Sequence, residues 1–182
     1  MMRITGGSGR GRKLTVPAGD RVRPTSDKVK QALFNILGEQ VRGARFLDLF
    51  AGAGGIGLEA LSRDAGQVVF VESARESLSA IRRNIESLGC TDRALVIASK
   101  AESFLKRPSG PYEIIFLDPP YRRELEPLLR LIAGSGIVKP GGLVIAEHFK
   151  KQPSPEHAGN LERYREAVYG DTVLAFYRDA RE

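Results

Sequence analysis

The stretch Phe46–Leu61, FLDLFAGAGGIGLEAL, decides the fold of this chain. An apolar run ends at Asp48, a turn containing Gly52, Gly54 and Gly57 follows, and an Ala/Leu/Glu segment begins at once. This order predicts a strand, a tight turn and a helix. The turn matches G-x-G-x-x-G, in which glycines permit positive φ and helix-end amides approach a ligand. The pattern favours a nucleotide-like ligand, and it does not distinguish a nicotinamide cofactor from S-adenosylmethionine.

The composition is that of an ordinary globular protein, with 182 residues, 42% hydrophobic and 27% charged. This length suits one domain with a proper core. No apolar run approaches the ~20 residues that span a bilayer, and the Arg- and Gly-rich start lacks the apolar region of a secretory signal. The single cysteine, Cys90, cannot form an internal disulfide, which fits a reducing compartment. We therefore expect a cytoplasmic protein without a membrane partner.

Positive charge is concentrated at the N-terminus. Residues 1–30 contain eight Lys and Arg side chains against two Asp, which equals the net charge of +6 of the whole chain. The remainder balances at 20 basic and 20 acidic residues. This asymmetry indicates a polyanionic partner, although a solvated tail is the alternative. The candidate contacts to that partner are Arg3, Arg10, Arg12 and Arg23.

The basic segment is predicted to form a hairpin and a helix. Two β-like pieces, Arg3–Thr5 and Lys13–Val16, surround a Gly/Ser/Arg turn. A helix follows in SDKVKQALFNILG, with Thr25 or Ser26 as N-cap and Gly38 as stop. We expect its apolar face to pack against the main domain. That face consists of Val29, Leu33, Phe34 and Leu37.

From Phe46 onward strands and helices alternate with short connections, as in an α/β domain. After the first strand, we expect strands at Gln67–Val71, Ala94–Ala98, Tyr112–Leu117 and Leu143–Glu147. We expect helices at Ser77–Leu88, Glu102–Lys106 and Leu125–Ile132. The chain thus divides into a basic N-terminal hairpin and helix, residues 1–40, and a main domain, residues 41–182.

The C-terminal part has a different pattern. Pro140-Gly141-Gly142 predicts a turn, and Lys150–Asn160 predicts an exposed loop. Arg163–Val168 and Thr172–Tyr177 predict an antiparallel hairpin that closes the sheet edge. The complete prediction is a mostly parallel sheet of seven strands with a C-terminal antiparallel hairpin.

Glu72 ends the second predicted strand, 20 residues after Gly52. In doubly wound folds an acid at this place accepts hydrogen bonds from ribose hydroxyls, and the alternative is an exposed glutamate at a helix start. The third strand ends in Ala98-Ser99-Lys100-Ala101. Small residues such as Ala101 could let an adenine ring lie against the backbone there.

The sharpest chemical signal is Asp118-Pro119-Pro120-Tyr121, directly after a predicted buried strand. Two prolines fix φ and remove two amide donors, so fixed carbonyls and a carboxylate converge at the carboxyl edge of the sheet. If Asp118 and the Pro119 carbonyl accept both N–H bonds of an exocyclic amine, the nitrogen lone pair can point at an electrophilic methyl group. Tyr121 would stack on the base. The alternative is a strand-terminating turn with a capping Asp.

The glycine loop, Glu72 and the DPPY motif together resemble the class I S-adenosylmethionine-dependent methyltransferases that modify exocyclic amines. Three further segments resemble the bacterial small-subunit ribosomal RNA guanine-N2 methyltransferases, the RsmD family, and the resemblance runs from the first residues to about Glu147. These segments are Arg3-Ile4-Thr5-Gly6-Gly7, Arg23-Pro24-Thr25 and Leu33-Phe34-Asn35-Ile36-Leu37.

The resemblance implies a Rossmann-like methyltransferase fold, an N-terminal hairpin used on RNA, and a target guanine in a partly assembled small subunit. It implies S-adenosylmethionine as cofactor, held by Asp48, Gly52, Gly54 and Glu72, with the base held by Asp118 through Tyr121. Many methyltransferases also place an acid near the adenine amine, and Ser99-Lys100 offers none. Asp48 would repel a pyrophosphate and attract the ammonium group of the cofactor.

The expected mechanism is direct in-line transfer without a covalent enzyme intermediate, dominated by positioning of the reactants. The two histidines, His148 and His157, lack the spacing of a metal site, and His148 is interpreted as structural. Cys90 precedes the third strand on the amino edge of the sheet, so it is not expected to be a nucleophile. A small balanced body without heptads favours a monomer.

Three other functions compete with this hypothesis. An adenine-N6 methyltransferase acting on DNA or RNA could use the same DPPY motif, but there is little room for a DNA base-recognition domain. A non-catalytic RNA-binding or assembly protein would need neither Asp118 nor an intact cofactor loop. A nicotinamide-dependent dehydrogenase would need a second domain and an acid/base residue that the sequence does not offer.

Overall fold

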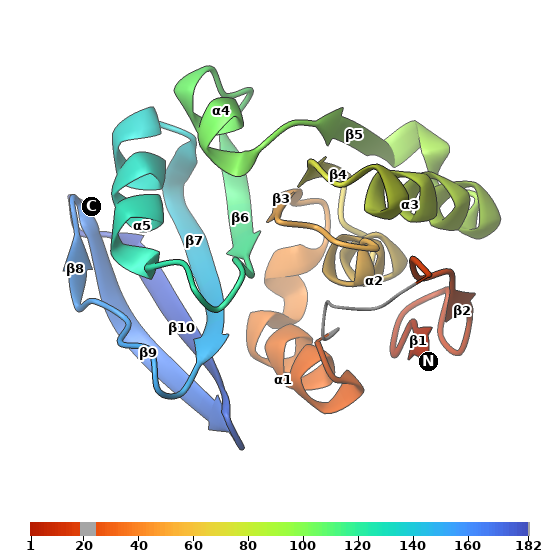
Figure 1. Cartoon of the computed structure of the whole chain (residues 1–182), viewed down its shortest axis with the longest axis horizontal. Helices are drawn as coiled ribbons and strands as arrows, with labels where there is room; N and C mark the ends of the chain where they lie inside the picture. The colour runs from red at the N-terminus through yellow and green to blue at the C-terminus, as the bar shows by residue number, and fades with distance from the viewer. Residues whose placement is uncertain (19–24, 182) are drawn as a thin grey trace.

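The computed structural model describes residues 1–18 and 25–181. Its centre is a sheet whose parallel strands are β3 (Arg45–Leu49), β4 (Gln67–Glu72), β5 (Ala94–Ala98), β6 (Tyr112–Leu117) and β7 (Val138–Phe149). Antiparallel pairing adds β10 (Thr172–Asp179), β9 (Leu161–Tyr169) and β8 (His157–Ala158). The order across the sheet is β5-β4-β3-β6-β7-β10-β9-β8 (Figure 1). The α/β prediction and the C-terminal antiparallel hairpin are confirmed.

The sheet has eight strands where the sequence predicted seven. The additional strand is β8, in the segment Lys150–Asn160 that was predicted to be a loop. Ala158 is buried and pairs with Leu161. Two residues are too few to show a period of two, so only the pairing with β9 reveals this strand.

The predicted turn at Pro140-Gly141-Gly142 lies inside β7 and does not separate two elements. Tyr112 pairs with Val138 and Ile114 pairs with Leu143, so β7 contains extra residues that bulge out of the register. Gly142 suits this bulge, because an added Cβ would lie 2.7 Å from the Lys139 carbonyl oxygen.

Helices cover both faces of this sheet. They are α1 (Asp27–Leu37), α2 (Gly55–Ser62), α3 (Arg75–Leu88), α4 (Ala101–Lys106) and α5 (Leu125–Ser135), with short 3-10 turns η1 (Gly38–Val41) and η2 (Thr91–Arg93). The core under α1, α2 and α3 contains Phe46 and Phe116, whereas the core under α4 and α5 contains Leu47 and Leu117. Successive residues of one strand enter opposite cores because Cβ atoms alternate across a strand. None of the helices within the described ranges is long and apolar enough to cross a bilayer.

The N-terminal prediction is confirmed with shorter strands. β1 (Met2–Arg3) and β2 (Lys13–Leu14) form the antiparallel hairpin. Ser26 caps α1 by accepting a hydrogen bond from the Val29 amide at 3.3 Å, and Gly38 ends the helix. The four apolar residues of the expected helix face are all buried.

Buried polar contacts attach the hairpin to the main domain. Thr5 donates from its amide and its hydroxyl to the two oxygens of Glu59, at 2.9 and 2.7 Å. Lys30 forms an ion pair with Glu59 at 3.5 Å and donates to the Arg3 carbonyl. Ser62 donates to the Gly6 carbonyl at 2.6 Å. The hairpin is therefore a docked element of the domain.

Candidate functional site

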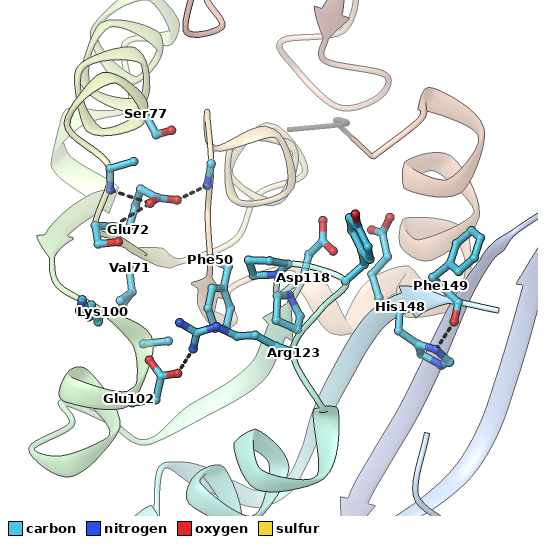
Figure 2. A pocket seen from close by; sticks show the side chains of 18 of the residues that line it. Phe50, Val71, Glu72, Ser77, Lys100, Glu102, Asp118, Arg123, His148 and Phe149 are labelled. Atoms are coloured by element: carbon cyan, nitrogen blue, oxygen red, sulfur yellow. Dashed lines mark hydrogen bonds and ion pairs between the residues drawn. The ribbon is translucent and has the colours of Figure 1, made fainter. Parts of the chain in front are cut away.

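The candidate site is a pocket of about 700 Å³ at the carboxyl ends of the parallel strands. Its walls come from the turns after β3, β4, β5 and β6 and from the end of β7. This is the edge at which doubly wound sheets bind their ligands, and the volume is typical of a small-molecule site. Figure 2 shows Glu72 at one end of the pocket, His148 and Phe149 at the other, and Asp118 between them.

Glu72 joins the end of β4 to the glycine loop. Its Oε2 accepts from the Gly52 amide at 2.8 Å, and its Oε1 accepts from the amides of Ser73 and Ala74 at 2.7 and 2.8 Å. A carboxylate has about four acceptor sites, so these bonds leave capacity for a hydroxyl from a ligand. Gly52 itself has φ of 56°, a conformation that glycine adopts without strain. Both predicted residues line the pocket.

Asp48 lies behind the glycine loop and Gly54 belongs to it, and neither is among the described residues that line the pocket. Asp48 is 2% exposed, and its Oδ2 accepts from the Gly57 amide at 2.9 Å near the start of α2. Burial raises the pKa of Asp48 well above its usual range, although the Gly57 amide opposes this shift. Gly54 caps α2 with φ of 87°. These residues shape the loop, and their contact with a cofactor stays a prediction.

The wall next to Glu72 comes from the β5–α4 turn, where the Ser99 amide donates to the Glu72 carbonyl at 2.9 Å. Ser99, Lys100 and Ala101 line the pocket there, and Ala101 is the buried first residue of α4. Their contact with an adenine ring stays a prediction. Ser77 of α3 also lines it. Small side chains on both elements leave room for a flat ring.

Sequence reasoning missed a contact between Phe50 and Arg123. Phe50 has φ of 58°, which is uncommon for a bulky residue. The Arg123 guanidinium lies 5.6 Å from the centre of its ring and forms an ion pair with Glu102 (Figure 2). Arg123 lies two residues after the DPPY motif in sequence, so proximity along the chain was a usable signal. The Phe50 conformation left no trace in the residue pattern.

The DPPY turn is anchored from the β7–β8 connection. Pro120 accepts at its carbonyl from the Arg123 amide at 2.8 Å, and Gln152 donates to the carbonyls of Tyr121 and Arg123. The Tyr121 side chain is 69% exposed. Within the described part of the chain, no donor reaches the Pro119 carbonyl. Asp118 through Tyr121 all line the pocket.

Asp118 lies beside a second carboxylate, Glu147, that sequence reasoning did not single out. The last paired residues of β6 and β7 are Leu117 and Ala146, so Asp118 and Glu147 occupy the next positions and share one face. The Glu147 Oε2 accepts from the Thr25 hydroxyl at 2.7 Å. Burial raises the pKa of Asp118 well above its usual range, and Glu147 and Asp48 add to this shift.

His148 points away from Asp118 (Figure 2). It is buried, and its Nδ1 lies 3.0 Å from the Phe149 carbonyl oxygen.

Burial raises the pKa of the Cys90 thiol, which keeps it in the unreactive protonated form. Among the described residues there is no cluster of His, Cys, Asp or Glu that could hold a metal ion.

Three of the four predicted RNA contacts lie on the docked hairpin. Arg3 forms an ion pair with Asp27 at 2.8 Å, and Arg12 donates to the Ser87 carbonyl of α3 at 2.7 Å. Arg10 is exposed in the turn between β1 and β2. Arg23 lies outside the described residues.

Comparisons with known proteins find relatives along nearly the whole chain. The family model described as "Conserved hypothetical protein 95" matches residues 2–178. The Bacillus subtilis protein YlbH is 41% identical over 97% of this chain and 98% of its own length. The ribosomal RNA small subunit methyltransferase D of Escherichia coli K12 is 38% identical over 97% of this chain and 89% of its own length.

Solved structures show the same fold. Escherichia coli yhhF superposes with a TM-score of 0.88 at 37% identity, covering 100% of this chain and 99% of that one. An RNA methyltransferase from Salinibacter ruber, in complex with S-adenosyl-L-homocysteine, has a TM-score of 0.69 at 15% identity, covering 88% of this chain and 95% of that one. Because the family model and the curated relatives cover nearly the whole chain, the protein belongs to the conserved hypothetical protein 95 family, which is the RsmD family of methyltransferases.

Proposed function

We propose that this protein transfers a methyl group from S-adenosylmethionine to the exocyclic N2 of a guanine in small-subunit ribosomal RNA. One observation carries the proposal: the pocket joins a ribose-type acceptor, Glu72, to an amine-type acceptor pair, Asp118 and the Pro119 carbonyl. The name of the relative from Escherichia coli K12, ribosomal RNA small subunit methyltransferase D, supports the same reaction class and substrate.

The residues around Glu72 fit this cofactor. Glu72 retains acceptor capacity for a ribose hydroxyl, Gly52 brings the loop backbone close, and Ala101 with Ser77 leaves room for the adenine ring. Asp48 contributes negative charge behind the loop, on the side of a cationic amino-acid tail. When bound, S-adenosylmethionine would supply a methyl group that is electrophilic because it is attached to a sulfonium.

The DPPY turn prepares the acceptor nitrogen. Asp118 and the Pro119 carbonyl accept the two N2–H bonds, which favours a pyramidal N2 whose lone pair is less conjugated with the ring and points at the methyl group. Tyr121 is free to stack on the base because most of its side chain is exposed. The raised pKa of Asp118 also suits this carboxylate to take up the proton that N2 loses.

The proposal also covers the RNA contacts, the cellular compartment and the oligomeric state. Arg3, Arg10, Arg12 and Arg23 bind the phosphate backbone of the RNA, and residues 1–40 are the RNA-binding extension of a methyltransferase domain formed by residues 41–182. The substrate is a partly assembled small subunit in the cytoplasm, and the enzyme acts as a monomer.

Mass spectrometry tests this function. Small-subunit particles and naked ribosomal RNA, both from cells lacking this methyltransferase, are incubated with the protein and methyl-labelled cofactor, and the digested nucleosides are identified. We expect labelled N2-methylguanosine at one position. Labelled N6-methyladenosine would favour the adenine alternative. Absence of any labelled nucleoside, together with intact RNA binding, would favour the non-catalytic assembly protein.

A further inference from the structure

The pocket continues beyond Asp118 to a second acid that the transfer reaction itself does not use. Glu147 lies at the end of β7, on the sheet face that Asp118 shares. It is 9% exposed, yet it lines the pocket. Methyl transfer to an amine requires acceptors for two N–H bonds, and Asp118 and Pro119 already supply them. Glu147 lies where it can accept from a further donor on the bound base, since a carboxylate has several acceptor sites.

The Watson–Crick edge of guanine provides that donor. Its N1–H lies next to the N2 amine, so a guanine held by N2 at Asp118 presents a third N–H bond beside it. In adenine the atom next to the exocyclic amine is an unprotonated N1, which is an acceptor. An ionised carboxylate is an acceptor only. A carboxylate at this place thus attracts the guanine edge and repels the adenine edge.

We propose that Glu147 is a specificity-determining residue that accepts the N1–H of the target guanine beside the N2–H accepted by Asp118. This inference rests on the proposed function and deepens it, because it explains how one DPPY motif selects guanine over adenine. The bound base brings its neighbouring N–H donors to two neighbouring carboxylates, which are acceptors only when ionised.

The surroundings of Glu147 hold it in place for this role. β7 is an inner strand with β6 on one side and β10 on the other, and Glu147 pairs with Leu174. Thr25, just before α1, donates to Oε2 at 2.7 Å. Through Thr25, the residue that we propose recognises the base contacts the N-terminal extension that we assign to RNA binding.

The test compares guanine with 2-aminopurine at the mapped target position. 2-Aminopurine keeps the 2-amino group but has an unprotonated N1. Ribosomal RNA carrying either base is assembled into particles, and kcat/KM for methyl transfer is measured with the wild-type protein and with Glu147→Gln. The Gln side chain has nearly the same shape and can donate to an unprotonated N1.

We expect the wild-type protein to prefer guanine by about 100-fold or more, since a buried acceptor left facing another acceptor is costly. Glu147→Gln should lower kcat/KM for guanine by about 10- to 100-fold while the rate for 2-aminopurine stays the same or rises. Glu126→Gln, at an exposed side chain on α5 that does not line the pocket, is the matched control and should leave both rates unchanged.

The outcomes separate this inference from the proposed function. A wild-type protein that methylates no guanine refutes the function itself. If guanine N2 is methylated but the wild-type protein accepts 2-aminopurine equally well, or Glu147→Gln retains the wild-type preference, only the role of Glu147 is overturned. Calorimetry should show that Glu147→Gln binds S-adenosylmethionine with unchanged affinity. If the variant does not fold, the preference of the wild-type protein for guanine over 2-aminopurine remains the test.

Discussion

Two groups of acids in this protein have opposite electrostatic surroundings. The hairpin dock consists of Thr5, Lys30 and Glu59, and the acid cluster consists of Asp118 and Glu147 beside the pocket. In the dock, the fully buried Glu59 has hydrogen bonds from Thr5 and an ion pair with Lys30. In the acid cluster, burial and a neighbouring carboxylate raise the pKa of Asp118. Glu59 is paired with a cation, whereas Asp118 lies next to a like charge.

This difference separates stability from function. A buried acid with a complete set of donors stabilises the contact that it makes, because no polar group remains unsatisfied. A carboxylate beside a like charge raises the free energy of the empty site, and donors on a ligand relieve that cost. The dock therefore fixes the hairpin on the domain, whereas we propose that the acid cluster receives a donor-bearing base.

The largest effect is expected from breaking the dock. Glu59→Ala should lower the free energy of unfolding by about 3–5 kcal/mol, because it leaves Lys30 buried without its counter-charge. Urea denaturation measures this loss. The double variant Glu59→Leu/Lys30→Met is the control and should lose less than Glu59→Ala. An equal or greater loss in the double variant would show that the ion pair is not what the single variant disrupts.

Removing the Asp118 carboxylate, which accepts from the target amine, should lower the rate of transfer and leave the affinity for the cofactor unchanged. Asp118→Ala should lower kcat by about 10²–10³-fold, comparable to the loss of one pre-organised donor in other active sites. Calorimetry with S-adenosylhomocysteine should show an affinity within twofold of the wild-type value, since Glu72 and the loop are untouched. A variant with wild-type turnover would contradict the assigned role of Asp118.

The acid cluster should also carry a cost in stability that depends on pH. The pKa of Asp118 is raised in the folded protein above the value of about 3.9 for an unfolded Asp. Between these two values the folded state binds more protons, so the free energy of unfolding falls as pH rises. Asp118→Asn should therefore stabilise the fold by about 0.5–2 kcal/mol at pH 7, and this gain should vanish toward pH 3. Thermal unfolding across this range checks the sign, and a gain that persists at low pH would exclude this cause.

The smallest effect is expected at the exposed turn of the hairpin. Arg10→Ser should weaken RNA binding and reduce the slope of log affinity against log salt by about one. Arg130→Ser, on α5 across the sheet, is the matched control because its exposed guanidinium pairs with Glu126. Equal salt dependence in the two variants would mean that Arg10 does not contact the phosphate backbone.

Local patterns in the sequence predicted the strands, turns and helices that form the site. The run Phe46–Leu61 predicted strand, turn and helix, and the position of Glu72 after a buried strand predicted that it would line the pocket. The DPPY motif predicted a turn at the carboxyl edge for the same reason. Each prediction depends on the apolar period or on turn chemistry within a few neighbouring residues, and those preferences act before any long-range contact forms.

The tertiary structure alone decided which distant residues meet. Glu147 became part of the site because the register of β6 against β7 brings it beside Asp118, and a shift of one residue would turn it to the other face. Asp48 accepts from the Gly57 amide behind the loop, and Glu59 contacts Thr5 and Lys30, which lie far from it in the sequence. Such contacts depend on strand pairing and on the desolvation of buried charges, which no local pattern of residues encodes.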